Sequence, residues 1–368
     1  TVSGAVGTDI GTVTVTQSGG TTFSSTVNAA IVTLTNTTGT ITFNGALTAT
    51  TLYAEEAGYN VAINGGSTIT DAATFSNTGT VTLAGTTAFT GGVTATAPSS
   101  ITLNGTVTAA GTAVITLGDA DTGISVTGNS TVGGTSTGAI TLGAATLSDG
   151  ITLTVGTGIG NALSLSSVTG TSGGTASNLT INTTGAVTVS GAVGTDIGTV
   201  TVTQSGGTTF SSTVNTATVT LTNTTGTITF NGALTATTLS TATQGYNVAI
   251  NAGGTITNAV TFSNTGTVTL GNDSSDSITF TGGVTATAPS QVNIAGTVQS
   301  TNTAISIGDS DTPTVLTANT TISGNTSGNI TLGGTVNGAY TLDINTTGTT
   351  TLSGIIGGST ALTSLTTN

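Results

Sequence analysis

Two pairs of closely spaced aspartates are the strongest candidates in this sequence for binding a cation. Asp119 and Asp121 stand in Gly-Asp-Ala-Asp-Thr-Gly, and Asp309 and Asp311 stand in Gly-Asp-Ser-Asp-Thr. Two carboxylates one residue apart on a turn offer the hard oxygen ligands that Ca²⁺ binds. The structural alternative is that Asp is a favoured turn residue, and that a duplicated segment duplicates its turns. The calcium-binding pattern Gly-Gly-x-Gly-x-Asp is absent, so calcium is a hypothesis for these four residues, and we expect no other cofactor.

The remaining acidic pairs carry weaker signals. Asp273/Asp276 and Glu55/Glu56 each occur in only one copy of a long internal repeat. Two carboxylates suffice for glycoside hydrolysis, but carbohydrate clefts are usually lined with aromatic rings and with Arg or Lys. This chain has four Tyr and no cationic side chain. We therefore expect no enzymatic activity and assign no catalytic residue.

The missing residue types exclude several further functions. The chain has no Lys, Arg, His or Cys, and its 13 acidic residues give a net charge of −13. Nucleic-acid binding needs cations that displace counterions from phosphate. Histidine bases, cysteine nucleophiles and zinc sites need side chains that are absent here. No apolar stretch approaches the roughly 20 residues of a transmembrane helix, so we expect neither nucleic-acid partners nor membrane insertion.

A long internal repeat divides the chain. Residues 1–52 return almost unchanged at 188–239, and the similarity continues beyond them. The sequence therefore predicts a first long repeat at 1–187 and a second at 188–350, which is shorter by about one short repeat. A third copy begins at 351–368, where Thr-Leu-Ser-Gly-Ile-Ile-Gly-Gly matches the opening Thr-Val-Ser-Gly-Ala-Val-Gly-Thr. We expect the three parts to form one continuous solenoid.

A short repeat lies inside the long one. Four segments share an alternating apolar-polar pattern that ends in Gly, and they begin at an even spacing, at Ile41, Val61, Val81 and Ile101. Alternation with period two is typical of a strand with one buried face. Asn-Gly, Gly-Gly and Ser-Asp-Gly between the strands are turn sequences. No segment has the apolar spacing of an amphipathic helix.

A unit of about 20 residues cannot bury its own apolar face, so stacked units are expected. The predicted fold is all-β: a single-stranded parallel β-helix (β-solenoid) with about 20 residues per coil and roughly 18 coils. Val61, Ile63, Ile69 and Phe75 are expected to face inward, which predicts three sides. Parallel crossovers favour right-handed winding. Strands about 4.8 Å apart predict a rod on the order of 85–90 Å long, with the eight Phe residues in short internal stacks.

Two other architectures fit the sequence less well. A β-sandwich or a tandem of immunoglobulin-like modules favours repeats near 90–100 residues with longer alternating strands. A β-propeller favours blades of about 40 residues with motifs of their own. The short, even spacing of the strands argues against both.

The coil pattern [Ile/Val]-Thr-[Leu/Phe]-x-Gly, as in Ile41–Gly45 and Ile101–Gly105, resembles a known group of surface proteins. These are the β-helical repeats of bacterial filamentous haemagglutinins, autotransporter passengers and large β-strand-repeat surface proteins. The resemblance covers nearly the whole chain. It implies export, a rod-like β-helix, and adhesion or surface coating, and it brings no catalytic residues.

From these observations we expect a structural extracellular protein: a segment of a cell-surface filament, sheath or surface layer. Its partner would be itself, either as a homopolymer or through neighbouring repeats of the same protein, stacked end to end. One alternative is the adhesin stalk of a larger secreted surface protein. Another is a threonine-ladder ice-binding protein, because Thr40/Thr42, Thr80/Thr82 and Thr199/Thr201 point outward, although Asn60/Ala62 and Ser100/Thr102 take the equivalent places in other coils.

Overall fold

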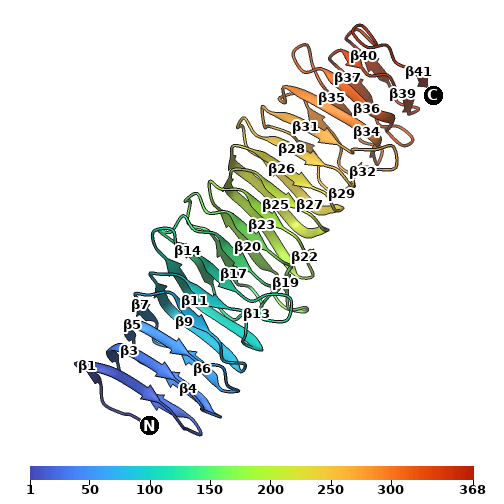
Figure 1. Ribbon diagram of the computed structural model, residues 1–368. Helices are drawn as coiled ribbons and strands as arrows, with labels where there is room; N and C mark the ends of the chain where they lie inside the picture. The colour runs from blue at the N-terminus through green and yellow to red at the C-terminus, as the bar shows by residue number, and fades with distance from the viewer. The chain divides into compact units, whose positions relative to one another are not determined.

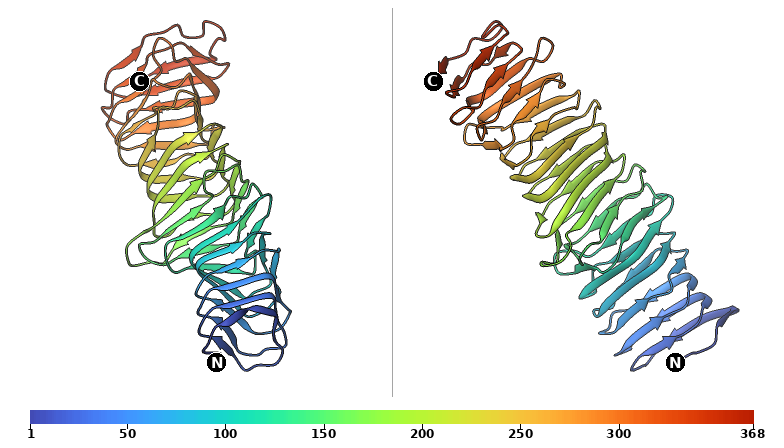
Figure 2. Two further views of the ribbon diagram at one scale, coloured as in Figure 1. Left: turned by 90° about the vertical axis from the view of Figure 1, so that its left-hand side faces the viewer. Right: turned by 180° about the vertical axis from the view of Figure 1, so that it is seen from behind.

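The protein is built from β-strands and contains no helix. The computed structural model describes residues 1–368 and divides into two compact units, Thr1–Val187 and Thr188–Asn368. Within each unit the strands lie side by side in successive coils (Figures 1 and 2). No helix of the structure is long and apolar enough to cross a membrane. The predicted β-solenoid is confirmed, with parallel coils about 21 residues apart.

In the first unit, each coil contributes one strand or half-strand to each of three parallel ladders. The first ladder holds β2 (Thr21–Phe23), β4 (Thr40–Phe43), β6 (Asn60–Ile63), the first halves of β9 (Thr80–Phe89) and β11 (Ser100–Ala109), β13 (Gly123–Val126), β16 (Ala145–Leu147) and β19 (Val168–Gly170). The second holds the first halves of β3 (Val27–Leu34) and β5 (Leu47–Ala54), β7 (Ser67–Ile69), the second halves of β9 and β11, β14 (Ser130–Gly134), β17 (Thr152–Val155) and β20 (Ser177–Asn182). The third holds most of β1 (Val6–Val15), the second halves of β3 and β5, β8 (Ala73–Phe75), β10 (Val93–Ala95), β12 (Ile115–Leu117), β15 (Ile140–Leu142) and β18 (Leu163–Leu165).

The second unit has the same plan. One ladder holds the end of β21 (Val187–Val189), β24 (Thr208–Phe210), β26 (Thr227–Phe230), β28 (Asn247–Ile250), β31 (Thr267–Leu270), the first halves of β34 (Gln291–Ser300) and β36 (Thr314–Ser323), and β38 (Val336–Asn337). Another holds β22 (Val193–Gly194), the first parts of β25 (Val214–Thr224) and β27 (Leu234–Thr241), β29 (Gly254–Ile256), β32 (Ser277–Phe280), the second halves of β34 and β36, β39 (Thr341–Asn345) and β41 (Ser364–Thr367). The last holds β23 (Ile197–Ser205), the second parts of β25 and β27, β30 (Val260–Thr261), β33 (Val284–Ala286), β35 (Ile305–Ile307), β37 (Ile330–Leu332) and β40 (Thr350–Leu352).

The coils are not of equal length. Ile41 pairs with Val61, whereas Ile115 pairs with Ile140, which is a longer step along the chain. The extra residues lie in the turns, so the paired strands stay in parallel register. The longer coils reduce the predicted number of roughly 18 coils to about 17 turns.

The interior of each coil follows the alternation in the sequence. In β4 the inward residues Ile41 and Phe43 are fully buried, while Thr40 and Thr42 face outward. The expected aromatic stacks are present: Phe23 lies parallel to Phe43, with ring centroids 5.0 Å apart, and Phe210 repeats this with Phe230. Offset and edge-to-face ring pairs stabilise a core beyond their buried area.

In each unit, a buried tyrosine and a buried asparagine form hydrogen bonds between neighbouring coils at one corner, the turn that holds the tyrosine. The buried Tyr59 hydroxyl donates to the carbonyl of Leu34 at 3.0 Å, and the buried Asn77 Nδ2 donates to the carbonyl of Tyr59 at 3.0 Å. The second unit repeats both bonds with Tyr246 and Asn264. Buried backbone carbonyls need such partners wherever a turn interrupts the ladder, so these side chains join neighbouring coils at the corner.

Candidate functional site

The predicted aspartate pairs lie on exposed turns, and in each pair the first carboxylate closes the turn. Asp119 Oδ1 accepts hydrogen bonds from the backbone amides of Asp121 and Thr122, both at 2.9 Å. Asp309 Oδ1 accepts from the amides of Asp311 and Thr312 at 3.0 and 3.1 Å. An aspartate that bonds the backbone two and three residues ahead stabilises a tight turn. The structural role proposed for these residues is therefore present in both units.

The threonine that follows each pair attaches the turn to the preceding coil. Thr122 Oγ1 donates to the carbonyls of Thr96 and Pro98, at 2.8 and 2.5 Å. Thr312 repeats this bond pair in the second unit. Both threonines are buried, and the sequence pattern gave no sign of this role. In the Asp-x-Asp-Thr segment, the first Asp thus stabilises the turn and the Thr joins it to the preceding coil.

In each pair, the second carboxylate accepts no backbone hydrogen bond within the turn and is the one more available to a cation. Asp121 and Asp311 are exposed at the tips of the turns. No group of three or more His, Cys, Asp or Glu side chains lies close enough to hold a metal ion. A calcium ion at these turns would therefore depend on one or two carboxylates, backbone carbonyls and water. Calcium stays a prediction for Asp119/Asp121 and Asp309/Asp311.

The other acidic pairs lie apart from these turns. Asp273 and Asp276 belong to a loop between β31 and β32, where Asp276 Oδ2 accepts from the amides of Asn272 and Asp273. The hydroxyl and the amide of Ser275 both donate to Asp273, and these bonds lower the pKa of the Asp273 carboxyl. The loop is thus closed by its own side chains. Glu55 and Glu56 lie exposed after β5.

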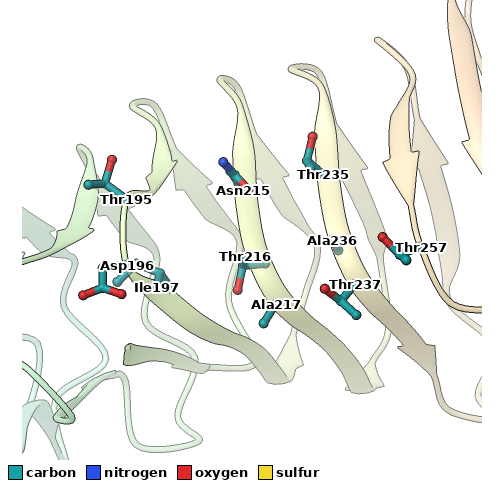
Figure 3. Close-up of a pocket in the computed structure, with 10 residues that line it drawn as sticks. All are labelled: Thr195, Asp196, Ile197, Asn215, Thr216, Ala217, Thr235, Ala236, Thr237 and Thr257. Atoms are coloured by element: carbon teal, nitrogen blue, oxygen red, sulfur yellow. The ribbon is translucent and has the colours of Figure 1, made fainter. Parts of the chain in front are cut away.

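A groove that the sequence did not predict runs across successive coils of the second unit. It has a volume of about 320 Å³ and is lined by Thr195, Asp196, Ile197, Asn215, Thr216, Ala217, Thr235, Ala236, Thr237 and Thr257. Figure 3 shows these side chains in rows along successive coils. Most of the lining is hydroxyl, amide and methyl groups, and Asp196 is its only ionisable residue. A single carboxylate without a second acid or a base cannot form an acid–base pair.

A two-residue bulge forms one wall of this groove. Val193 pairs with Val214, whereas Thr199 pairs with Thr218, so the strand before Thr199 holds two extra residues. The backbone of Thr195 and Asp196 takes left-handed φ angles of 49° and 64°, which are costly for residues with a Cβ. Asp196 Oδ2 is shielded from solvent and has no hydrogen-bond partner. The sequence signal for the bulge is the Gly-Thr-Asp insertion, which also follows Val6 in the first unit.

The outward threonines form columns, and in the second unit two columns lie side by side, because Thr199 pairs with Thr218 and Thr201 pairs with Thr220. Thr74, Thr94, Thr116 and Thr141 pair in register on the third ladder of the first unit. Two residues before three of these threonines the chain carries Ala72, Gly92 and Val114. On the first ladder, Thr42 pairs with Ala62 and Thr40 with Asn60, as the sequence indicated. Thr is a common residue on exposed strands, and ice binding stays a prediction.

Comparisons with known proteins give no relative for the chain. No family model, no curated protein and no solved structure matches it.

Proposed function

We propose that this chain is a structural segment of an extracellular filament, sheath or surface layer. In this proposal the coils of one repeat stack on those of the next, either along the same chain or between copies. The repetitive interior, the absence of lysine and arginine that trypsin would cleave, and the resemblance to β-helical surface proteins support an exposed structural role. Adhesion by the same surface would be a second use of the same scaffold.

The observation that carries the proposal is the junction between two copies inside the second unit. The third copy of the long repeat begins at 351, and its first strand lies on the last coils of the second copy. Leu352 pairs in parallel with Leu332, and Ile356 pairs with Val336. The end of one copy therefore accepts the start of the next as an ordinary coil. A repeat with this property can be extended without a change of register.

The outermost coils carry side chains suited to a further coil. Ile10 is 42% exposed in β1, and its counterpart one long repeat later, Ile197, is 3% exposed. Leu365 in β41 is also 42% exposed, although its register partner Leu342 is fully buried. Unpaired strand edges invite pairing with another strand. A further coil on either face would cover both the apolar side chains and the open backbone groups.

Electron microscopy of the purified chain over a range of concentrations tests the proposal. We expect fibres or sheets with a repeat near 4.8 Å along the coil axis, more abundant at high concentration. Separate particles at all concentrations would contradict the proposal. The same series in calcium and in a chelator tests the aspartate turns. Assemblies that dissolve only in chelator would assign calcium to Asp119/Asp121 and Asp309/Asp311, and unchanged assemblies would reject it.

A further inference from the structure

One outward face differs sharply between the two long repeats, although the backbone around it is the same. Residues 47–52 and 58–64 are identical to 234–239 and 245–251, and β5 and β27 each pair with the preceding and following coils in the same way. We call Ile31, Tyr53, Glu55, Glu56 and Asp71 the Tyr53 face. Its counterparts in the second unit are Thr218, Ser240, Ala242, Thr243 and Asn258.

The centre of the Tyr53 face is an aromatic ring exposed to solvent. Tyr53 is 54% exposed, the most exposed aromatic side chain of the chain. It stands on β5, between Thr33 and Thr74 in register. A groove of about 230 Å³ runs beside it, lined by Leu52, Tyr53, Ala54, Glu55, Ala72, Thr74 and Ser76. Ile31, which pairs with Thr51, adds a second exposed apolar side chain, at 37% exposure. The ring is therefore open to a ligand over one flank.

Carboxylates surround this ring on both sides. Asp71 Oδ2 accepts a hydrogen bond from Thr51 Oγ1 at 2.6 Å, which holds the carboxylate over the strand two residues before Tyr53. Glu55 follows two residues after Tyr53 on the same outward face, so each carboxylate-bearing position is about 7 Å along the strand from the ring. Glu56 is exposed beside Glu55. In the second unit Asn258 Nδ2 donates to Thr238 Oγ1 at 3.0 Å, which keeps the bridge but removes the charge.

These negative charges have no positive partner in the chain. The sequence has no Lys, Arg or His, so the carboxylates of the Tyr53 face meet no side-chain cation. The charge of Glu55 also acts inward, because it adds to burial in raising the pKa of the Tyr59 hydroxyl. The second unit avoids both effects by carrying Ala242 and Thr243 instead. The first unit thus keeps a negatively charged face that no side chain of the protein neutralises.

We propose that the Tyr53 face docks a basic segment of another protein. An arginine or lysine side chain would lie over the Tyr53 ring, where the ring quadrupole attracts a cation. Glu55, Glu56 and Asp71 would accept charge-assisted hydrogen bonds from the same or neighbouring basic side chains. Ile31 would contact the aliphatic stem of such a side chain. A second copy of this chain has no Lys or Arg side chain to place there, so this contact is independent of the stacking proposed above.

The experiment measures binding of a nine-residue peptide of alternating Arg and Gly by isothermal titration calorimetry at physiological salt. The control peptide carries citrulline, which is neutral and similar in shape, in place of Arg. We expect one site per chain for the Arg peptide and none for the citrulline peptide. The combined substitution Tyr53→Ser, Glu55→Ala, Glu56→Thr and Asp71→Asn copies the second unit and should weaken binding at least tenfold. Tyr53→Ser alone should weaken it several-fold without changing the net charge.

Two matched variants separate a site from general attraction to an acidic protein. Asp9→Asn, Asp121→Asn and Asp311→Asn together remove three exposed carboxylates elsewhere and should leave the affinity within about twofold. The reverse substitution, Ser240→Tyr, Ala242→Glu, Thr243→Glu and Asn258→Asp, should raise the stoichiometry from one site to two. Circular dichroism checks that each variant is folded. The proposal is overturned if the Arg peptide does not bind, or if the distant charge control weakens binding as much as the Tyr53-face variant.

Discussion

The coil of β5 in the first unit and the coil of β27 in the second share most of their interior, where the buried Ala54 becomes the buried Thr241, and differ more in their exterior. Leu47 and Leu52 are buried, as are their counterparts Leu234 and Leu239. Tyr53, between buried neighbours on β5, becomes Ser240. An inward residue must fit the coils before and after it, because protein interiors are close-packed. An outward residue has no such constraint, so a stacked coil can change its surface while most of its core stays the same.

Differences in coil length between the two units also lie outside the buried interior. Val81 pairs with Ile101 in the first unit, whereas in the second unit Val268 pairs with Val292, a longer step along the chain. The additional residues around Asp273 form a loop outside the ladders, and its aspartate side chains bond its own backbone. The strands on either side keep their parallel register. Turns therefore absorb this insertion without a change in the register of the strands on either side.

Removing a stacked ring should have the largest effect, and it should be the same in both units. Phe43→Ala and Phe230→Ala each delete a fully buried ring that stacks on a partner 5.0 Å away. We expect each to lower the free energy of unfolding of its region by about 3–5 kcal/mol. Native-state hydrogen exchange of the neighbouring coils measures the loss. The outward substitutions Thr42→Ala and Thr229→Ala serve as controls and should change the free energy of unfolding by no more than about 0.5 kcal/mol. A large difference between Phe43→Ala and Phe230→Ala would show that the cores of the two units are not equivalent.

The corner asparagines come next. Asn77→Ala and Asn264→Ala each leave a buried tyrosine carbonyl without the side-chain donor that now lies at 3.0 or 3.1 Å. An unsatisfied buried group costs about 1–3 kcal/mol, so both variants should unfold at lower urea concentration. Both asparagines are fully buried. If only one variant were destabilised, the two corners would not be equivalent.

Alkaline pH should separate the two corners. Burial, the larger cause, raises the pKa of Tyr246 from 10.0 to about 12. Because the folded pKa is the higher one, this contribution to stability is complete below pH 10 and is lost as the pH rises towards about 12. Tyr246→Phe should flatten the fall in urea midpoint over that range. At Tyr59, burial and then the charge of Glu55 raise the pKa, so Glu55→Ala should lower it. An unchanged ultraviolet titration of Tyr59 in that variant would contradict this coupling.

Replacing Tyr53 and the three carboxylates of the Tyr53 face should have the smallest effect on stability. Tyr53, Glu55, Glu56 and Asp71 are all exposed, and the second unit already folds with Ser, Ala, Thr and Asn in their places. We expect the combined variant to change the free energy of unfolding by less than about 1 kcal/mol, and in the stabilising direction at low salt, since it removes like charges. Urea unfolding at low and high salt measures this change. A loss of several kcal/mol would mean that the face belongs to the core.

The sequence predicted the fold well because inward residues repeat at a fixed spacing. Ile41, Val61 and Val81 identify the ladder, and Val61, Ile63, Ile69 and Phe75 all prove to be buried. The structure has about 17 turns against the roughly 18 coils predicted, because several coils, such as the one from Ile115 to Ile140, are longer in their turns.

The candidate sites were harder to predict from sequence. The roles of Asp119 and Thr122 depend on backbone groups in the same turn and in the preceding coil. The groove beside Asp196 depends on a two-residue bulge, and the match between 1–52 and 188–239 hides such an insertion because both copies carry it. The Tyr53 face can instead be found by aligning the two copies, because its residues differ between them.

We propose that the last coil of one copy of this protein stacks on the first coil of the next. Leu365→Lys tests it most directly, because it places a charge on the inward side of the last coil, where a further coil would bury it at high cost. Thr366→Lys is the matched control: its register partner is the half-buried Asp343, between the buried Leu342 and Ile344. Sedimentation velocity over a concentration series is the measurement. We expect the parent chain and Thr366→Lys to assemble while Leu365→Lys remains a single chain. Equal assembly of the two lysine variants would contradict it.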